Sequence, residues 1–354
     1  MRIVHLADSM EMGGAERLIG LLCRLQRQQG HNPSVHCLYQ VGVLGEELRA
    51  DGFEVTLHPT VAGGRAHSIY KGFKLAKPDV VHCHNATAAI VGAIPARLAG
   101  AKTIVVTRHG LVAPPYVLRR ELKFAAVSRW CDWIVAVCEA ARCNLVAAPF
   151  AASRKVVRVY NAAPTLRCNG TPPPVKSGFT VLHVARLSLA KDQETLLRAF
   201  SLAKAGVPDL RLWIVGDGSL RSTLEGITQD LRLTDSVTFF GEQRDVAPFF
   251  AAADLFVLSS VTEGVPVSLL EAMSAGVPAV VTDVGGMSEI ARLSPTIVTA
   301  PPSNSQALAD ALRGMADSRS ELPRLRNIAR QFYLANFTLD RMASEYMALY
   351  NSAN

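Results

Sequence analysis

Residues 255–276 read LFVLSSVTEGVPVSLLEAMSAG, and the fold can be worked out from this stretch. Its first four residues are apolar, which predicts a buried strand. A loop follows, and Pro266 stands at the expected first position of a helix. The helix predicted over Val267–Ala275 ends at Gly276, because glycine favours the left-handed backbone of a helix C-terminus. A strand, a short loop and a helix in this order are the unit of a parallel α/β sheet.

The same alternation extends over the rest of the second half of the chain. The predicted strands there are Thr180–Val184, Leu210–Val215, Val237–Phe239, Leu255–Leu258 and Ala279–Thr282. The predicted helices are Asp192–Ala205, Leu220–Leu231 and Val267–Ala275. Continuous apolar strands that alternate with helices indicate a parallel sheet covered on both faces.

The first half repeats this pattern. Its predicted strands are Arg2–Ala7, Ser34–Tyr39, Val55–Leu57, Val80–His82, Thr103–Thr107 and Ile134–Cys138, and its predicted helices are Ala15–Gln29 and Glu46–Ala50. The last stretch, Leu339–Tyr350, has apolar residues at helical spacing. The predicted fold class is therefore α/β, with two doubly wound, Rossmann-like domains.

Length and a proline-rich break set the domain boundaries. A chain of 354 residues is too long for one ordinary domain. Residues 169–174, Asn-Gly-Thr-Pro-Pro-Pro, are stiff and cannot join a sheet. We expect a first domain over residues 1–168, a linker over 169–178 and a second domain over 179–337. Ligands of such sheets bind beyond the carboxyl ends of the strands, so we expect the site in a cleft that both domains face.

Composition and cysteine usage exclude several classes of protein. Hydrophobic residues make up 49% of the chain and charged residues 19%, which argues against disorder. No apolar run reaches the roughly 18 uncharged residues of a membrane span, and the N-terminus lacks a signal-peptide pattern, so we expect a cytoplasmic protein. The 7 cysteines form no Cys-x-x-Cys pair and indicate reduced thiols.

A metal ligand set is suggested by His82-Cys83-His84 alone. These residues end a predicted strand, where successive side chains point to opposite faces of the sheet. Three convergent ligands are therefore not expected, and we predict no metal site.

The net charge of +7 is unevenly distributed. Residues 1–162 carry +9 and residues 163–354 carry −2. A basic half is compatible with nucleic acid, an anionic membrane surface or phosphorylated substrates. No nucleic-acid-binding motif accompanies the charge, so nucleic acid is not an expected partner.

Two glutamates mark the candidate site. Glu263 lies in the loop over the carboxyl edge of the second sheet, and Glu271 lies one to two turns into the following helix. The amides of Gly264 and Val265 are placed to meet an anion or hydroxyls at the start of that helix. Carboxylates suit the recognition of vicinal sugar hydroxyls. The spacing alone fits a second interpretation equally well, in which Glu263 is an acid at the start of a helix, Glu271 is a surface acid and neither binds a ligand.

Residues 259–276 resemble the Glu-x7-Glu motif of the retaining glycosyltransferase family 4, whose fold is called GT-B. The resemblance implies that Glu263 lies beside the transferred hexose and that Glu271 binds the ribose hydroxyls of the donor. Further motifs resemble the family in the same order along the chain. They are Met12–Glu16, Arg108–Gly110, Val184–Leu187 with Lys191-Asp192, Ile214–Gly218 and Phe240–Val246.

The resemblance assigns roles to single residues. The implied catalytic residues are His109, Arg186, Lys191 and Glu263. The implied donor-binding residues are Gly13, Gly14, Gly216, Gln243, Arg244, Gly264, Val265 and Glu271. Glu16 and Asn85 are expected on the acceptor or sugar side. The helix over residues 338–354 is implied to pack back on the first domain.

The activity that the resemblance implies is transfer of a hexose or related sugar with retention of configuration. The donor would be a UDP- or GDP-linked sugar held by the second domain, and the acceptor a glycan or a lipid-linked molecule in polysaccharide or glycolipid biosynthesis. No cofactor is implied.

The phosphate chemistry has its own physical basis. Arg186 follows a strand and Lys191 precedes a helix, so both cations can neutralise a leaving diphosphate. The sequence has no Asp-x-Asp pair of the kind that holds a metal against a diphosphate, which predicts metal independence. Gly13-Gly14 lacks the Gly-x-Gly-x-x-Gly pattern of a dinucleotide-binding oxidoreductase.

Alternatives remain open at the level of the sequence. Residues 160–164, Tyr-Asn-Ala-Ala-Pro, depart from the family, in which Asn-Gly is usual, and this puts the hinge in doubt. Another GT-B enzyme, such as an epimerase or a phosphorylase, would carry similar motifs. A non-catalytic scaffold that binds nucleotide sugars is the alternative from a different class.

Residues 115–130 combine basic and bulky apolar side chains. A helix that starts near Pro115 would present four cations, which are Arg119, Arg120, Lys123 and Arg129. Leu118, Leu122, Phe124 and Trp130 lie among them. This combination suits an anionic membrane surface, so the inner face of the cell membrane is a second expected location. A helix with an ordinary core face is the alternative.

Overall fold

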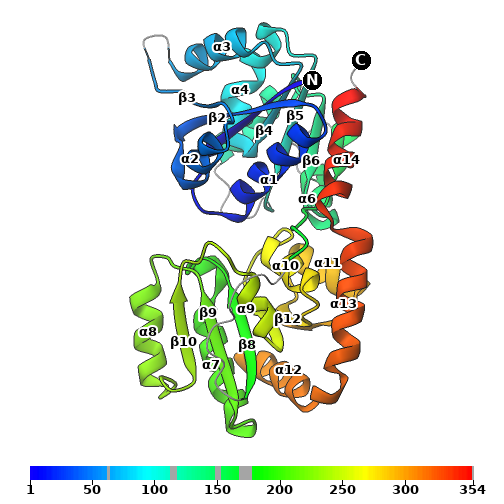
Figure 1. The fold of residues 1–354 in the computed structure, drawn as a ribbon. Coiled ribbons are helices and arrows are strands. Elements are labelled where there is room, and N and C mark those ends of the chain that lie inside the picture. The colour runs from blue at the N-terminus through cyan, green and yellow to red at the C-terminus, as the bar shows by residue number, and fades with distance from the viewer. Residues whose placement is uncertain (62–63, 112–117, 148–152, 167–177, 353–354) are drawn as a thin grey trace. The chain divides into compact units, whose positions relative to one another are not determined.

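The computed structural model describes residues 1–354 except 62–63, 112–117, 148–152, 167–177 and 353–354. The described chain divides into two compact units (Figure 1). Unit 1 comprises Met1–Ala162 and Leu339–Asn354, and unit 2 comprises Ala163–Thr338.

Unit 1 is built on a seven-stranded sheet in the order β3-β2-β1-β4-β5-β6-β7. The strands are β1 (Arg2–Ser9), β2 (Asn32–Gln40), β3 (Val55–Leu57), β4 (Val80–His84), β5 (Thr103–Arg108), β6 (Trp133–Ala136) and β7 (Val156–Arg158). Every pairing between neighbours is parallel. The strand order reverses between β1 and β4, where His5 is paired with His82.

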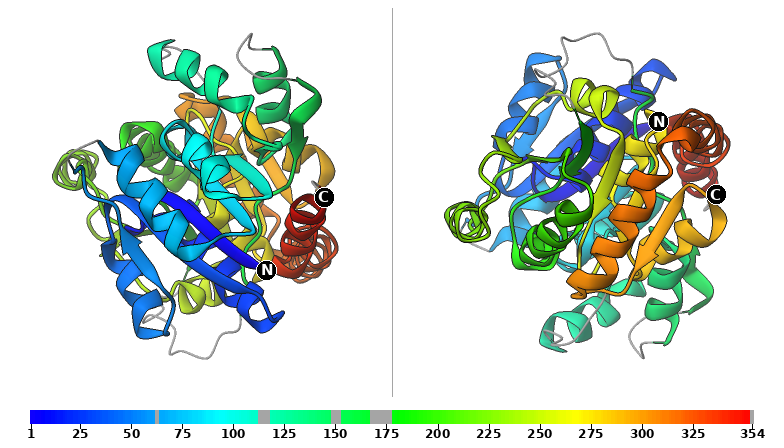
Figure 2. Two further views of the ribbon diagram at one scale, coloured as in Figure 1. Left: turned by 90° about the horizontal axis from the view of Figure 1, so that it is seen from above. Right: turned by 90° about the horizontal axis from the view of Figure 1, so that it is seen from below.

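Helices lie on both faces of this sheet (Figure 2). They are α1 (Gly14–Gln28), α2 (Gly42–Ala50), α3 (Arg65–Ala76), α4 (Asn85–Ala99), α5 (Leu118–Ser128), α6 (Glu139–Ala147) and α14 (Leu339–Asn351). Helix α4 packs between α3 and α5, whereas α1 packs against α2 and α14. The C-terminal helix α14 therefore belongs to unit 1, and it also contacts β5.

Unit 2 has a six-stranded sheet in the order β10-β9-β8-β11-β12-β13. The strands are β8 (Phe179–Val184), β9 (Leu210–Val215), β10 (Val237–Gly241), β11 (Leu255–Leu258), β12 (Ala279–Thr282) and β13 (Ile297–Ala300). The helices are α7 (Gln193–Gly206), α8 (Arg221–Asp230), α9 (Ala247–Ala252), α10 (Val267–Ser274), α11 (Gly285–Leu293), α12 (Ser305–Asp317) and α13 (Leu322–Asn336). The order reverses between β8 and β11, as it does between β1 and β4 in unit 1.

Burial explains why the strands are apolar without alternation. All residues of β5, β11 and β12 are buried, since helices cover both faces of each sheet. In unit 2 a core of residues from β8, β9, α7 and α12 fills one of these layers. The prediction of two doubly wound α/β domains is confirmed.

Several elements differ from the sequence predictions. Helices α3, α4 and α6 were not predicted; α4 is apolar nearly all round, so it lacks the one-sided period of a surface helix. Strand β4 continues two residues beyond the predicted end and includes His84. Pro266 is the N-cap of α10, with φ −65° and ψ 130°, and is not the first helical residue as predicted.

The boundary of unit 2 also falls earlier than expected. The Tyr333 hydroxyl donates to the Ala163 carbonyl over 2.9 Å, and the Leu166 amide donates to Ser274 Oγ over 2.9 Å. These bonds attach residues 163–166 to α13 and α10, so they belong to unit 2 and not to a first domain that ends at residue 168. Cys168 and residues 169–177 of the predicted linker lie outside the described residues.

The cysteines within the described ranges are free thiols. Cys23, Cys37, Cys83, Cys131 and Cys138 are buried, and Cys143 is exposed. In the part of the chain that the structure describes, no helix is long and apolar enough to cross a membrane.

Candidate functional site

The loop after β8 carries Arg186 and Lys191 of unit 2. Arg186 is exposed, and Lys191 ends a single 3-10 turn over Leu189–Lys191. Asp192 follows with φ 47° and caps α7, because its Oδ1 accepts from the Thr195 amide over 3.3 Å. The loop therefore leaves β8 at the carboxyl edge of the sheet and delivers both cations there.

Two glycines hold this loop close to the next strand. Gly216 has φ 127°, and a Cβ on it would lie 2.1 Å from the Ala185 carbonyl oxygen. A Cβ on Gly218 would lie 2.3 Å from the Leu187 carbonyl oxygen. The Leu187 amide donates to the Asp217 carbonyl over 2.9 Å. Only glycine allows this approach, so Gly216 shapes the Arg186 loop; its predicted contact with the donor stays a prediction.

A buried glutamine and a buried histidine hold the same loop in place through hydrogen bonds. Gln193 Nε2 donates to the Arg186 carbonyl over 2.9 Å and lies 3.2 Å from His183 Nε2. His183 Nδ1 lies 3.0 Å from the Val257 carbonyl, to which it donates. Burial lowers the pKa of His183 to about 4, so the ring is neutral and its Nε2 accepts. No sequence motif pointed to Gln193 or His183.

Glu263 joins this loop through side chains. Its Oε1 pairs with Lys191 Nζ and accepts from Ser260 Oγ over 2.9 Å. Ser259 Oγ donates to the Lys191 carbonyl over 2.8 Å. The structure therefore brings together Lys191 and Glu263, two of the predicted catalytic residues, and adds Ser259 and Ser260, which were not predicted.

Helix α10 starts directly behind Glu263. Gly264 is buried. A Cβ on Gly286, at the start of α11, would lie 2.3 Å from the carbonyl oxygen of Gly264. Val265 is buried as well. Glu271 lies in the second turn of α10 and is 6% exposed, so it is no surface acid. Anion binding by the Gly264 and Val265 amides stays a prediction.

The loop after β10 holds Gln243 and Arg244. Gly241 has φ 69°, and Gln243 Nε2 donates to the Phe240 carbonyl over 2.8 Å. Arg244 is exposed. Unit 2 thus carries Arg186, Lys191 and Glu263 at one edge of its sheet, where cations can stabilise charge that develops on a leaving diphosphate.

In unit 1 the glycine loop starts α1. Gly13 is the N-cap with an extended backbone, at φ −166° and ψ 162°. Gly14 is exposed and is the first helical residue, one position before the predicted start. Glu16 lies half-buried in the first helical turn.

His109 follows β5 and is held by its neighbour on α4. Asn85 starts α4 with φ 71°, and its Oδ1 accepts from the His109 amide over 3.2 Å. His109 Nε2 lies 3.1 Å from His84 Nδ1. The structure therefore brings together His109, a predicted catalytic residue, and Asn85, a residue predicted on the acceptor or sugar side.

Three further histidines converge in unit 1. The ligand atoms of His5, His82 and His84 lie within 4.8 Å of one another. Cys83 lies on the other face, near Gly92, as the strand pattern predicted, but His5 on β1 supplies a third imidazole that the sequence argument did not consider. All ring nitrogens of the three histidines have hydrogen-bond partners, so we assign the cluster to hydrogen bonding.

Tyrosines from α14 complete this network. His82 Nδ1 lies 2.7 Å from the Tyr350 hydroxyl, and His82 Nε2 lies 2.7 Å from Thr107 Oγ1. Thr107 Oγ1 also lies 3.0 Å from the Tyr346 hydroxyl. Burial lowers the pKa of His82 and of His84 well below the ordinary histidine value, so the network is neutral.

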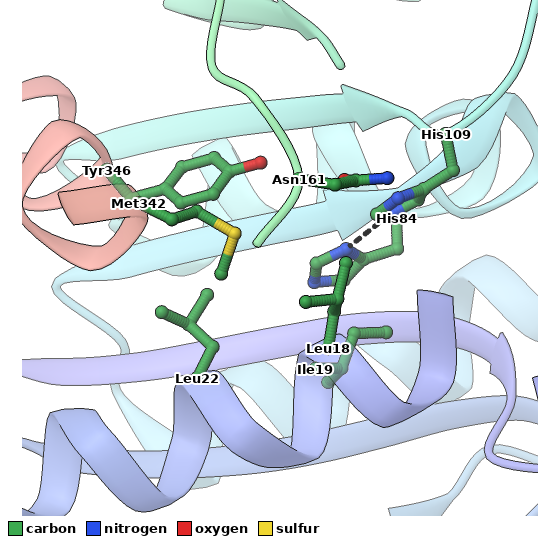
Figure 3. A pocket seen from close by; sticks show the side chains of 8 residues that line it. All are labelled: Leu18, Ile19, Leu22, His84, His109, Asn161, Met342 and Tyr346. Atoms are coloured by element: carbon green, nitrogen blue, oxygen red, sulfur yellow. Dashed lines mark hydrogen bonds between the residues drawn. The ribbon is translucent and has the colours of Figure 1, made fainter. Parts of the chain in front are cut away.

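A small pocket opens beside His84 and His109 (Figure 3). Its volume of about 10 Å³ is close to the space of one water molecule. Leu18, Ile19 and Leu22 of α1 form one wall, and Met342 and Tyr346 of α14 approach from the other side. Asn161 also lines the pocket.

The basic helix α5 has a mixed surface. Leu118, Leu122 and Trp130 are 53%, 52% and 45% exposed. The cations of this segment, Arg119, Arg120, Lys123 and Arg129, are exposed as well. Phe124 is buried under the Arg108 guanidinium, which also pairs with the buried Glu121. Phe124 therefore lies near the cations in sequence, as predicted, but is not part of the exposed surface. Residues 115–117 of the predicted helix lie outside the described residues.

Comparison with solved structures confirms the GT-B fold. HepE of Anabaena, in complex with UDP and glucose, superimposes with a TM-score of 0.89 at 20% identity and covers 99% of this chain and 100% of that chain. The chain belongs to the GT-B glycosyltransferases of family 4. Residues 12–166 match the family described as Glycosyltransferase Family 4, and residues 172–332 match Glycosyl transferases group 1.

Two relatives show what the family includes. The UDP-Gal:alpha-D-GlcNAc-diphosphoundecaprenol alpha-1,3-galactosyltransferase of Escherichia coli is 29% identical over 240 residues, or 62% of this chain and 61% of that protein. The lipopolysaccharide core biosynthesis glycosyltransferase LpsE of Rhizobium meliloti is 28% identical over 169 residues, or 48% of each chain. The chain thus spans about three fifths or less of these relatives.

Proposed function

We propose that the chain is a retaining glycosyltransferase that moves a hexose or related sugar from a nucleotide diphosphate sugar to an acceptor. The observation that carries the proposal is the edge of unit 2, where Lys191, on the loop that also carries Arg186, pairs with Glu263, and the buried Glu271 follows on α10. This arrangement has cations for a diphosphate and carboxylates for sugar and ribose hydroxyls.

Each group has one task in the proposed reaction. The acceptor hydroxyl forms a bond to the anomeric carbon while the bond from that carbon to the diphosphate oxygen breaks. The leaving phosphate takes the proton of the acceptor, as is implied by the resemblance to the family. Arg186 and Lys191 stabilise the charge on the diphosphate, and Glu263 binds the sugar. Because the two cations supply this charge, we propose that no metal ion is needed.

The class of donor and acceptor is part of the proposal. HepE is described in complex with UDP-glucose, and the relative from Escherichia coli is named for a UDP-linked galactose and a diphosphoundecaprenol acceptor. We propose a UDP- or GDP-linked donor and a glycan or lipid-linked acceptor in polysaccharide or glycolipid biosynthesis, and these two names support the UDP-linked donor and the lipid-linked acceptor. We place the activity in the cytoplasm, at or near the inner face of the membrane.

A transfer assay tests the proposal. The protein is incubated with UDP- and GDP-linked sugars and with glycan and polyprenyl-diphosphate acceptors, and the products are identified by mass spectrometry and NMR. The expected result is one new glycosidic bond with the anomeric configuration of the donor. An inverted product contradicts retention. Epimerised donor, or donor binding without any product, favours the epimerase or the non-catalytic scaffold instead.

We also propose that α5 binds an anionic membrane surface. Arg119, Arg120 and Lys123 project beside the exposed Leu118 and Leu122, and basic and apolar side chains together favour anionic interfaces. Each cation near such a surface contributes about 1 kcal/mol. Residues 1–162, with a net charge of +9, add long-range attraction.

Co-sedimentation with vesicles tests this surface. Wild-type protein should pellet with phosphatidylglycerol vesicles at low salt and not with phosphatidylcholine vesicles. The variant Arg119→Glu/Arg120→Glu/Lys123→Glu should stay in solution. The matched control Lys71→Glu/Lys74→Glu/Lys77→Glu changes the same charge on exposed positions of α3 and its end and should still pellet. Equal loss in both variants, or no binding by the wild type, contradicts the proposal.

A further inference from the structure

A chain of hydrogen bonds runs through unit 1 from α1 to His109. Gln26 Oε1 lies 2.9 Å from His5 Nε2, and His5 Nδ1 lies 3.1 Å from His84 Nε2. His84 Nδ1 lies 3.1 Å from His109 Nε2. Gln26 and His5 are fully buried, and His84 is 4% exposed. The chain therefore connects the core of the unit to one of the predicted sugar-binding residues.

The three histidines of this chain are neutral. Burial lowers the pKa of His5 and of His109 to about 4, and it lowers the pKa of His84 well below the ordinary value. A neutral imidazole has one N–H donor and one acceptor nitrogen. Each ring therefore donates with one nitrogen and accepts with the other, and the first bond decides the order of all the protons.

Gln26 decides that order. Its amide oxygen faces His5, so the proton of His5 lies on Nε2. His5 Nδ1 then accepts from His84 Nε2, and His84 Nδ1 accepts from His109 Nε2. The last nitrogen, His109 Nδ1, is left with a lone pair; it is buried and makes no hydrogen bond to the described residues.

The orientation of the Gln26 amide is given by its contact with His5. The amide oxygen lies 2.9 Å from His5 Nε2, and the amide nitrogen is buried without a hydrogen-bond partner among the described residues. Gln26 therefore presents its oxygen, and not its nitrogen, to His5.

We propose that Gln26 and His5 are positioning residues that hold the Nδ1 lone pair of His109 as the acceptor for a hydroxyl of the donor sugar. The proposal rests on the proposed function, in which His109 contacts that sugar. It deepens this role, because a neutral imidazole that accepts at Nδ1 recognises an O–H group and not a phosphate oxygen. Gln26 does not titrate, so the order of protons is the same over the neutral pH range.

The first test reads the protons directly and needs no ligand. Long-range ¹H–¹⁵N correlation spectra of the ¹⁵N-histidine-labelled wild type distinguish protonated from unprotonated ring nitrogens, and the His109→Gln variant assigns the His109 signals. The expected spectrum at pH 7 has His5, His84 and His109 protonated on Nε2 only. A proton on His109 Nδ1 overturns the proposal.

The second test separates sugar recognition from general damage. Calorimetric titration compares UDP-glucose with UDP, which lacks the sugar hydroxyls. Gln26→Leu should weaken binding of UDP-glucose roughly 2- to 12-fold, the range expected for one hydrogen bond, and leave UDP unchanged. The control His36→Leu removes a buried histidine that bonds His58 in the same unit, and it should change neither affinity.

The outcomes are distinct. Equal weakening of UDP and UDP-glucose in Gln26→Leu, or no change in either, overturns the positioning role. If the wild type binds UDP but gains nothing from any attached sugar, the proposed role of His109 fails. In that case the NMR spectrum still shows which ring nitrogens are protonated. The role of His109 Nδ1 as acceptor for a sugar hydroxyl is then rejected together with the proposed function.

Discussion

The two sheets reverse their strand order at equivalent places, and each place has a buried histidine that serves a different purpose. In unit 1, His5 on β1 bonds the side chains of Gln26 and His84 and starts a neutral chain. In unit 2, His183 on β8 bonds the Val257 carbonyl and Gln193, which holds the loop that carries Arg186. One topology thus supports a neutral hydrogen-bonded edge in one unit and a charged edge in the other.

The local charge at each sheet edge differs from the net charge of the half of the chain that carries it. Residues 1–162 carry +9, yet His84 and His109 at the edge of the sheet of unit 1 are neutral. Residues 163–354 carry −2, yet they place Arg186 and Lys191 at the edge of their sheet. Net charge therefore predicts long-range attraction, whereas local loop geometry decides which chemistry each edge supports.

The largest expected effect comes from the charged edge. Arg186→Ala should lower kcat and kcat/KM together by about 10²- to 10³-fold, since it removes a cation that acts on the leaving diphosphate in the transition state. Arg186 is exposed, so the fold should be unaffected. Steady-state kinetics measure the effect, with Arg186→Lys as the control that keeps the charge. Unchanged turnover in Arg186→Ala removes it from the catalytic residues.

Glu271→Ala should act on binding more than on turnover. Loss of hydrogen bonds to a charged acceptor costs about 1.5–3 kcal/mol, or roughly 10- to 150-fold in donor affinity. Calorimetric titration with the nucleotide sugar measures it, and Glu289→Ala on α11 is a control with the same chemical change. Equal affinities of wild type and Glu271→Ala contradict the ribose-binding role.

A fall in pH should destabilise unit 1 before it destabilises unit 2. Of the 9 histidines, 8 lie in unit 1, and burial lowers the pKa of His5 and of His109 to about 4. An unfolded histidine takes up a proton near pH 6.5, whereas these buried histidines do so only near pH 4. Their contribution to the free energy of unfolding is therefore complete above pH 6.5 and is lost as the pH falls toward 4. The slope is about 1.4 kcal/mol per pH unit for each such histidine.

Hydrogen exchange with mass spectrometry at pH 7 and pH 5 measures the difference between the units. After correction for intrinsic rates, protection should fall more in β1, β4 and β5 than in β8, β9 and β11. Replacement of His36, whose pKa burial lowers to about 3, by leucine should reduce the loss in unit 1. Earlier loss of protection in unit 2 would show that histidine burial does not govern the acid response.

Chelation should have the smallest effect. Because Arg186 and Lys191 supply the positive charge and the sequence has no Asp-x-Asp pair, activity should be unchanged in excess EDTA. The measurement is the initial rate with and without chelator, and with added magnesium or manganese. Activity that EDTA abolishes and either ion restores contradicts the assignment of the phosphate site.

Local patterns made much of this predictable. The strands of unit 2 and the positions of Glu263 and Glu271 follow from apolar runs and from one contiguous motif. The bonds of His5 could not be predicted in this way, because they join residues 21 and 79 positions apart. The burial of Phe124 could not be predicted, because sequence alone does not show which face of α5 packs against Arg108.

The most direct test of the central claim is calorimetric titration of the wild type with UDP-, GDP- and ADP-linked sugars. The account predicts that one of these nucleotide sugars binds at a single site in excess EDTA, and that Glu271→Ala weakens this binding at least about 10-fold. Folded protein that binds none of the nucleotide sugars, or binds one equally well after Glu271→Ala, would contradict it.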